Sequence, residues 1–174
     1  MTQGEHTMDK RVAGAPAGAI ERAPTTVGEN PEERTFKALL EAFPSTLTDF
    51  KKLRKGIVRA RIERRDLLEC CRYLKDKLGF EHISMISAVE YENRFEIVYH
   101  ITCYGSCLLL ELITQTPKDD PTVESVSSVW AGANWQERES YDLMGIKFNN
   151  HPNLERILLP KDFMYHPLRK DFKG

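Results

Sequence analysis

The chain has 174 residues, which suffices for one domain with its own core and is too short for two domains of ordinary size. Its 25 lysine and arginine residues nearly balance its 26 aspartate and glutamate residues, so no overall field attracts it to nucleic acid or to anionic lipid. No apolar run approaches the roughly 20 residues that cross a bilayer, so we expect no direct membrane span.

The N-terminal residues are predicted to form a flexible arm. Residues 1–31 are rich in glycine, alanine, proline and threonine and contain almost no large apolar residue. Such a segment cannot bury enough surface to offset its ordering entropy. Glu5 and Asp9 also argue against a secretory signal or a transit peptide, which makes a cytoplasmic location the default expectation. Met8 is an alternative start residue.

The predicted core domain spans residues 32–130 and begins with a helix. Pro31 stands at a first helical position, and two glutamates follow it, which are favourable at a helix N-terminus. Apolar residues then recur at helical spacing from Phe36 to Phe43. Pro44 is expected to end this helix.

A short strand and a second helix are expected next. Residues 57–62 alternate in the manner of a strand, and residues 67–78 carry an apolar stripe at helical spacing. Asp66 is the predicted N-cap of this helix, and Gly79 is its predicted end. The helix is therefore expected to pack one face against a sheet.

Residues 82–116 are predicted to be strands. Apolar and polar residues alternate over residues 95–103, and apolar residues return on a partner strand over residues 108–112. A turn at Gly105 and Ser106 joins the two strands into a hairpin. The polar segment 117–121 is expected to be a surface loop.

The last predicted elements are an extended stretch over residues 123–126 and a helix over residues 135–144. Asn134 is the predicted N-cap, Glu137 is expected to reach back to the helix start, and Gly145 is expected to end the helix. The fold class that follows is α+β, with helices on one face of a mixed or antiparallel sheet and an extended C-terminal tail. Residues 131–174 would then form a helix and docking tail within the same domain.

The four cysteines do not form a metal-binding or disulfide framework. Cys70 and Cys71 are adjacent on a predicted helix, so their side chains diverge by roughly 100 degrees. Cys103 and Cys107 flank a turn, at a spacing that matches no strong metal motif. We expect free thiols that behave as small buried hydrophobic residues.

Two histidines precede prolines, in His151-Pro152 and His166-Pro167. Neither has a carboxylate or a second histidine at helical ligand spacing, which favours hydrogen-bonding anchors in turns. An alternative is a stand-alone enzyme in which His151 forms an acid–base pair with Glu137 or Asp142.

The last quarter of the chain combines aromatic and charged residues. Aromatic and arginine side chains are enriched among interface anchors, and paired charges there can fix register between partners. The alternatives are an ordinary subdomain with a solvated charged face and a binding module unrelated to respiration. The aromatic members are Trp135, Tyr141, Phe148, Phe163, Tyr165 and Phe172.

An ordered motif begins in this segment. It comprises Trp135-Gln136-Glu137-Arg138-Glu139-Ser140-Tyr141-Asp142-Leu143-Met144-Gly145-Ile146, then Phe148, His151-Pro152-Asn153-Leu154, Arg156-Ile157-Leu158 and His166-Pro167-Leu168-Arg169-Lys170-Asp171-Phe172. These blocks closely resemble the signature of the 30-kilodalton (C) subunit of NADH:quinone oxidoreductase, respiratory complex I. The same family serves membrane-bound hydrogenases, sulfur-reducing complexes and an archaeal dehydrogenase that oxidises a reduced deazaflavin coenzyme.

The resemblance implies a non-catalytic subunit of the hydrophilic arm, peripheral to the cytoplasmic side of the membrane. It implies no cofactor in this chain, with iron–sulfur clusters in partner subunits. The implied partners are the large subunit derived from the hydrogenase catalytic chain and a neighbouring iron–sulfur subunit. The end at Gly174 is expected of a hydrogenase-like or minimal complex more than of the mitochondrial form.

By position, the resemblance assigns interface or fold roles, and no catalytic role, to a set of motif residues. The set is Trp135, Glu137, Arg138, Glu139, Tyr141, Asp142, Gly145, Phe148, His151, Pro152, Arg156, His166, Pro167, Arg169 and Lys170.

Overall fold

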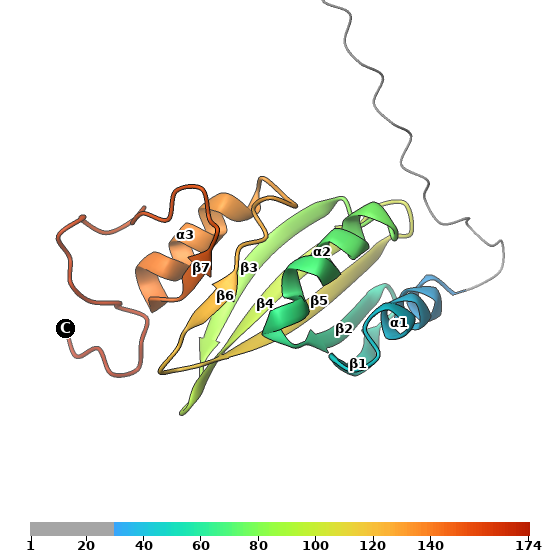
Figure 1. The fold of residues 1–174 in the computed structure, drawn as a ribbon, viewed down its shortest axis with the longest axis horizontal. Coiled ribbons are helices and arrows are strands. Elements are labelled where there is room, and N and C mark those ends of the chain that lie inside the picture. The colour runs from blue at the N-terminus through green and yellow to red at the C-terminus, as the bar shows by residue number, and fades with distance from the viewer. Residues whose placement is uncertain (1–29) are drawn as a thin grey trace, which may run out of the picture.

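The computed structural model describes residues 30–174 (Figure 1). Residues 1–29 of the predicted arm, with the alternative start Met8, lie outside the described residues. The helices are α1 (Pro31–Ala42), α2 (Leu67–Asp76) and α3 (Ala133–Met144), and a short 3-10 helix, η1, spans Arg64–Asp66. The strands are β1 (Leu47–Arg54), β2 (Ile57–Ile62), β3 (His82–Glu90), β4 (Arg94–Cys103), β5 (Leu108–Pro117), β6 (Thr122–Glu124) and β7 (Lys147–Asn149).

Five strands form a mixed sheet in the order β1-β2-β5-β4-β3. The strands β2 and β5 are parallel, whereas the other neighbours are antiparallel. The predicted hairpin pairs Phe95 with Thr116 and Cys103 with Leu108. The predicted α+β class with a mixed sheet is confirmed.

The first two helices form where the sequence predicted them, and they begin differently. The side chain of Asn30 accepts a hydrogen bond from the backbone N–H of Glu32 at 3.1 Å and caps α1. The side chain of Asp66 makes no such hydrogen bond on α2. Asp66 is the N-cap residue, as predicted, but η1 leads directly into α2 and gives Asp66 turn-like rather than extended backbone geometry.

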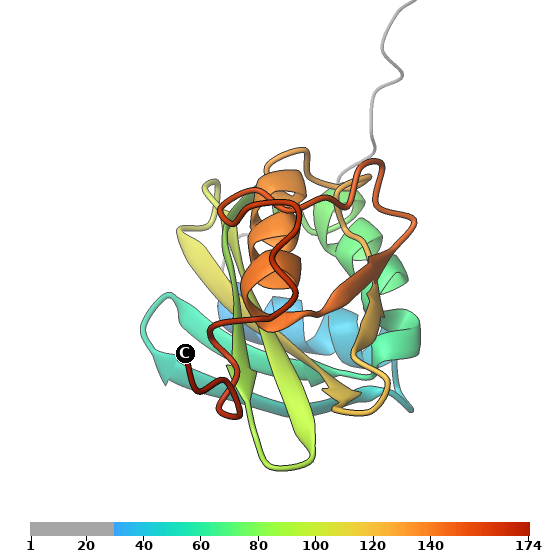
Figure 2. The ribbon, with the colours of Figure 1, turned by 90° about the vertical axis from the view of Figure 1, so that its left-hand side faces the viewer.

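The hydrophobic core lies between the helices and one face of the sheet. Figure 2 shows the three helices on the same side of the strands. Alternate residues of β4, from Phe95 to Ile101, face Leu39 of α1 and the apolar stripe of α2 in one cluster. The opposite face of the sheet carries ion pairs, such as Arg59 with Glu111. This face is the polar one, since the helices cover the other face of the sheet.

Strands β1 and β7 were not predicted. The predicted extended stretch over residues 123–126 overlaps β6. Strands β6 and β7 pair in parallel, with Val123 opposite Phe148. Each has three residues, too few for a periodic pattern to identify. The two strands place α3 beside the sheet.

The described residues contain four free cysteines, as expected. Three are buried, whereas Cys107 is exposed in the β4–β5 turn, so the expectation of burial was wrong for Cys107. None of the helices in residues 30–174 is long and apolar enough to cross a membrane.

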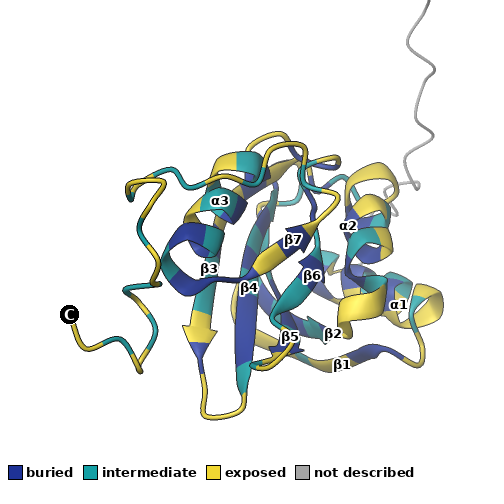
Figure 3. Cartoon of the chain, turned by 60° about the vertical axis from the view of Figure 1, so that its left-hand side comes forward, coloured by how far each residue is buried: buried dark blue, intermediate teal, exposed yellow. Residues whose placement is uncertain are grey.

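The C-terminal segment after β7 contains no helix or strand. Taken as whole residues, none of residues 149–174 is buried, in contrast with the core (Figure 3). The expected extended form of this tail is not confirmed, because the segment turns back along α3 and is held there by polar contacts.

Candidate functional site

Helix α3 begins at Ala133, before its predicted start at Trp135. Its N-cap is Gly132, without a side-chain cap hydrogen bond, and Asn134 lies inside the helix. The predicted cap at Asn134 was therefore wrong. Glu137 does not reach back to the helix start, because its carboxylate is bound elsewhere. Gly145 ends the helix with a left-handed φ of 72°, as predicted.

Glu137 points into the core and holds the loop that precedes α3. Its carboxylate accepts hydrogen bonds from the Ser125 hydroxyl at 2.6 Å and from the Val126 backbone N–H at 2.7 Å. Burial raises the pKa of Glu137, the two hydrogen bonds oppose that effect, and the result is a pKa of about 7. Glu137 thus joins α3 to the loop after β6.

His151 lies beside Glu137 at the start of the tail. Its Nε2 donates to the Asn134 carbonyl at 3.1 Å, and its Nδ1 accepts from the Asn153 backbone N–H at 3.1 Å. The distance from Nε2 to the Glu137 carboxylate is 3.8 Å, and both side chains are fully buried. His151 therefore makes hydrogen bonds of the anchoring kind that its position before a proline predicted.

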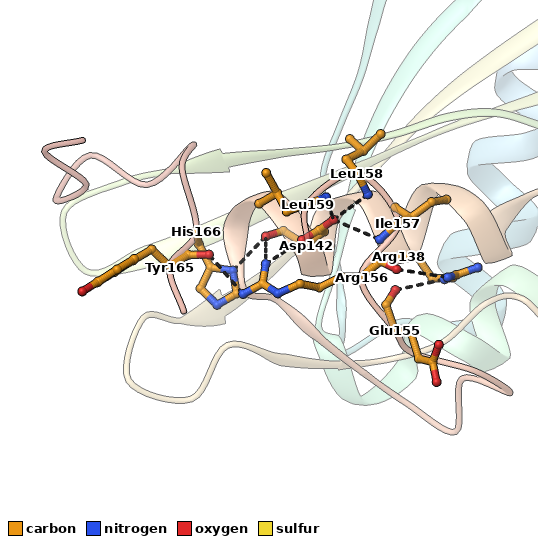
Figure 4. Close-up of polar contacts among 9 residues, drawn as sticks. All are labelled: Arg138, Asp142, Glu155, Arg156, Ile157, Leu158, Leu159, Tyr165 and His166. Atoms are coloured by element: carbon orange, nitrogen blue, oxygen red, sulfur yellow. Dashed lines mark hydrogen bonds and ion pairs between the residues drawn. The ribbon is translucent and has the colours of Figure 1, made fainter. Parts of the chain in front are cut away.

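Asp142 organises the tail from the opposite side of the same helix (Figure 4). Its Oδ2 accepts hydrogen bonds from three consecutive backbone N–H groups, those of Ile157 at 3.0 Å, Leu158 at 2.8 Å and Leu159 at 3.0 Å. Its Oδ1 accepts from Arg156 at 2.5 Å. The chain at residues 156–159 therefore wraps around one buried carboxylate.

These donors determine the ionisation of Asp142. Burial by itself raises the pKa of a carboxyl, but the N–H groups of residues 157–159 and the Arg156 guanidinium outweigh it and lower the pKa from 3.8 to about 2. Asp142 is consequently ionised throughout the neutral range, unlike Glu137 on the same helix.

Two arginines donate hydrogen bonds to backbone carbonyls of the tail. Arg138 donates to the carbonyl of Glu155 at 3.0 Å and to that of Arg156 at 3.3 Å. Arg156 in turn donates to the Tyr165 carbonyl at 3.1 Å. The motif arginines therefore bind the tail to α3 and to itself.

The end of α3 is covered by the last block of the motif. His166 Nδ1 donates to the Asp142 carbonyl at 2.9 Å, and Arg169 donates to the carbonyls of Met144 at 2.6 Å and Gly145 at 3.3 Å. These contacts satisfy the free carbonyls of a helix C-terminus. His166 is thus a second hydrogen-bonded histidine of the tail. The backbone N–H of Lys170 donates to Glu90 at 2.6 Å, which fixes the tail to β3.

Several large apolar side chains of the tail are exposed, together with Trp135 near the start of α3. Trp135 is 61% exposed, Tyr165 63% and Met164 81%. The guanidinium of Arg138 lies 5.1 Å from the Trp135 ring, and that of Arg156 lies 5.9 Å from the Phe163 ring. Phe163, Tyr165 and Phe172 pack together at 6.0–6.3 Å between ring centroids. We call the exposed residues Trp135, Leu158, Met164, Tyr165 and Leu168 the apolar tail surface.

The remaining motif residues divide between the core and the surface. Phe148 is buried in β7, and Tyr141 is half-buried with its ring edge near His166. Glu139 and Pro152 are exposed, and Pro167 is half-buried.

Sequence reasoning missed several partners of the motif. Ser125 and Glu90 lie outside it. Ser125 binds Glu137, 12 positions away in the sequence, and Glu90 binds the backbone of Lys170, 80 positions away. Lys118 also pairs with Glu90. No local pattern could have identified these partners, because the fold alone brings them to α3 and the tail.

The arrangement gives little support to acid–base catalysis. His151 does lie next to Glu137, but both ring nitrogens are engaged with the backbone and both side chains are buried. The Asp142 carboxylate accepts hydrogen bonds from four donors of the tail, not from His151. Among residues 30–174, no group of three His, Cys, Asp or Glu side chains is arranged to hold a metal ion.

Comparisons of the sequence point to one family. The model of the respiratory-chain NADH dehydrogenase 30 Kd subunit matches residues 60–174. The C subunit of NADH-quinone oxidoreductase from Geobacter metallireducens is 41% identical over 143 residues, which covers 80% of this chain and 88% of that protein. The C subunit of F(420)H(2) dehydrogenase from Methanosarcina mazei is 40% identical over 142 residues, which covers 80% of this chain and 90% of that protein.

Two solved structures share the fold. A trypsin-resistant fragment of Nqo5 superposes with a TM-score of 0.60 at 25% identity, covering 71% of this chain and 99% of the fragment. A chain of an archaeal membrane-bound sulfane sulfur reductase superposes with a TM-score of 0.72 at 24% identity, covering 81% of this chain and 85% of that chain. The sequence matches confirm the resemblance predicted from the motif, and the superpositions agree with it at the level of the fold.

Proposed function

Because the chain belongs to the family of the respiratory-chain NADH dehydrogenase 30-kilodalton subunit, we propose that it is a non-catalytic structural subunit of a membrane-bound, complex I-like, ion-translocating oxidoreductase. It acts in the peripheral arm, on the cytoplasmic side of the membrane. Its partners are the large hydrogenase-derived subunit and a neighbouring iron–sulfur subunit, and by docking it supports electron transfer through them.

The observation that carries the proposal is the contrast between charged residues that bind the tail and apolar residues that are exposed. Two charged residues of the motif, Asp142 and Arg138, hold the backbone of the tail. Some apolar residues of the motif and its neighbourhood are exposed, such as Trp135 and Tyr165, whereas Phe148 is buried. A tail fixed by polar contacts presents these side chains in one arrangement, which reduces the ordering cost of binding. A built interface explains this pattern, since a solvated surface has no need of it.

The apolar tail surface is the side on which we expect the large subunit. Tyr165→Ala should reduce the amount of that subunit recovered with the tagged chain severalfold, because an aromatic anchor contributes about 2 kcal/mol at an interface. The measurement is affinity purification from detergent-solubilised membranes followed by quantification of each associated chain.

Tyr104 provides the matched control for this experiment. It is 60% exposed, close to the 63% of Tyr165, and lies in the β4–β5 turn away from the motif. Tyr104→Ala should leave recovery unchanged. Equal losses in both variants, or none in Tyr165→Ala, would show that the apolar tail surface is not the docking site.

The purified chain is expected to contain no stoichiometric metal and no dehydrogenase activity. Its two motif histidines and its two buried motif carboxylates, Glu137 and Asp142, already make hydrogen bonds within the chain. Elemental analysis of the isolated chain by mass spectrometry tests this expectation. One iron or nickel per chain would contradict a purely structural role.

The electron donor of the host complex is a separate question. The relatives at 41% and 40% identity carry the names of an NADH-linked and an F420H2-linked complex, and the same role in a hydrogenase or sulfur-reducing complex is the alternative. The associated chains distinguish them. A flavin-bearing NADH-binding subunit would identify a respiratory complex I, and nickel ligands in the large subunit would identify a hydrogenase.

A further inference from the structure

A chain of hydroxyl groups leads from the surface to the buried carboxylate of Glu137. Ser127 is half-buried, and its Oγ lies 2.7 Å from the Oγ of Ser125. The Ser125 hydroxyl donates to Glu137 Oε2 at 2.6 Å. Because Ser125 has a single hydroxyl proton and gives it to Glu137, Ser127 is the donor in the pair of serines. The three groups form a continuous hydrogen-bonded path.

Glu137 has no permanent positive partner among residues 30–174. The groups that face it are His151 at the start of the tail, Cys71 of α2, Tyr99 of β4 and the loop N–H of Val126. The Tyr99 hydroxyl is buried without a hydrogen-bond partner. Both ring nitrogens of His151 are engaged with backbone groups. The carboxylate is therefore the group in this cluster that is free to change its protonation.

Asp142 and Glu137 differ in the groups that bind their carboxylates. Both carboxylates are fully buried on α3, five residues apart. Asp142 is bound by an arginine and three N–H groups, which compensate a fixed negative charge. Glu137 has one N–H and one hydroxyl, and a hydroxyl can reverse its direction. Only the site of Glu137 is built to accommodate both the ionised and the neutral carboxyl.

We propose that Glu137 is a proton-binding site that exchanges protons with solvent through Ser125 and Ser127. A hydronium ion gives a proton to Ser127, whose own hydroxyl proton passes to Ser125, whose proton passes to Glu137 Oε2. Each serine ends with one proton and a reversed hydrogen bond, and the carboxylate becomes a neutral acid that donates to Ser125. Release follows the same path backward.

The energetics place this exchange near neutral pH. Burial raises the pKa of Glu137 to about 7, against an ordinary value of 4.5. Since the folded-state pKa is the higher one, the contribution of this group to stability is fully present below about pH 4.5 and is lost as the pH rises through about 7. The site goes beyond the structural role and does not depend on the identity of the partner.

Infrared spectroscopy of the full chain with carbon-13-labelled glutamate tests the proposal. We expect a protonated glutamate band that disappears with a midpoint near the pKa of about 7, because Glu32, Glu90 and Glu96 have pKa values below the ordinary range. Glu137→Gln should abolish the band. Glu139→Gln, an exposed neighbour on the same helix, should retain it. The proposal is overturned if the unmodified chain shows no glutamate band with a midpoint above about pH 6 that Glu137→Gln removes.

The serine path has its own test, which remains informative if Glu137→Gln does not fold. Ser125→Ala removes a donor that favours the ionised form, so the midpoint should shift upward. Ser127→Ala should leave the midpoint in place and slow the exchange of the acid proton with solvent at least tenfold. An unchanged midpoint in Ser125→Ala, or unchanged exchange in Ser127→Ala, rejects the path.

Discussion

Replacing Asp142 by asparagine is expected to release residues 155–159 from α3 while the sheet and helices stay folded. An amide cannot satisfy both sets of donors, because its oxygen can face either Arg156 or the N–H groups of Ile157 to Leu159, and its NH2 group then opposes the other set. Breaking a buried charge pair of this kind costs about 3 kcal/mol. Hydrogen exchange at the amides of Leu158 and Leu159 should therefore accelerate roughly 100-fold.

The control for this change is Asp162→Asn. Asp162 is an exposed aspartate of the same tail, so its neutralisation should leave the exchange rates unaltered. If the amides of residues 157–159 keep their protection in Asp142→Asn, the carboxylate is not what holds the tail.

The same carboxylate predicts an acid-dependent release in the unmodified chain. The pKa of Asp142 is lowered from 3.8 to about 2 in the fold, so its stabilisation, about 2 kcal/mol, is fully present above pH 3.8 and is lost as the pH falls through about 2. Protection of the Leu158 amide should follow this profile. In Asp142→Asn the acid-dependent step should be absent.

Replacing Gly145 by alanine is expected to dislodge the end of the tail. The φ of Gly145 is 72°, which costs a residue with a Cβ about 1–2 kcal/mol. The added Cβ would also lie 2.6 Å from the ring of His166 and would collide with the Arg169 guanidinium. Both side chains must leave the C-terminus of α3, so the Leu168 amide, which donates to the Leu143 carbonyl at 3.1 Å, should lose its protection.

Gly105→Ala serves as the comparison. An added Cβ there meets nothing within 4 Å, and the φ of Gly105 is not positive. Exchange at Leu168 should not change in this variant. Loss of Leu168 protection in Gly105→Ala as well would show that the effect does not arise at the end of α3.

Much of the fold could be predicted because it is encoded in local patterns. The helix stripe that contains Leu67 and Leu74 and the alternation from Phe95 to Cys103 each identify an element and its buried face. The family could likewise be identified from an ordered motif that begins at Trp135.

The errors arose where a local rule competed with a distant partner. The pattern from Asn134 to Glu137 fits a capping box, yet Glu137 binds Ser125 and Val126, and α3 starts before Asn134. The predicted residues were chemically well chosen, but their partners were not in the pattern. A side chain that could form a local capping hydrogen bond can instead bind a donor that is distant in sequence and buried in the fold.

The α+β class, most helices and strands, and membership of the 30-kilodalton subunit family could be predicted from local patterns, because periodicity and motif order depend only on neighbouring residues. Long-range contacts in the fold determine which residues of the motif and the tail face inward and which face outward. Asp142 and Arg138 hold the tail, whereas Trp135 and Tyr165 remain exposed. The fold also gives two carboxylates of one helix opposite pKa shifts. The physical reason is that hydrogen-bond donors from residues 125–126 and 156–159 reach α3 only after the chain has folded.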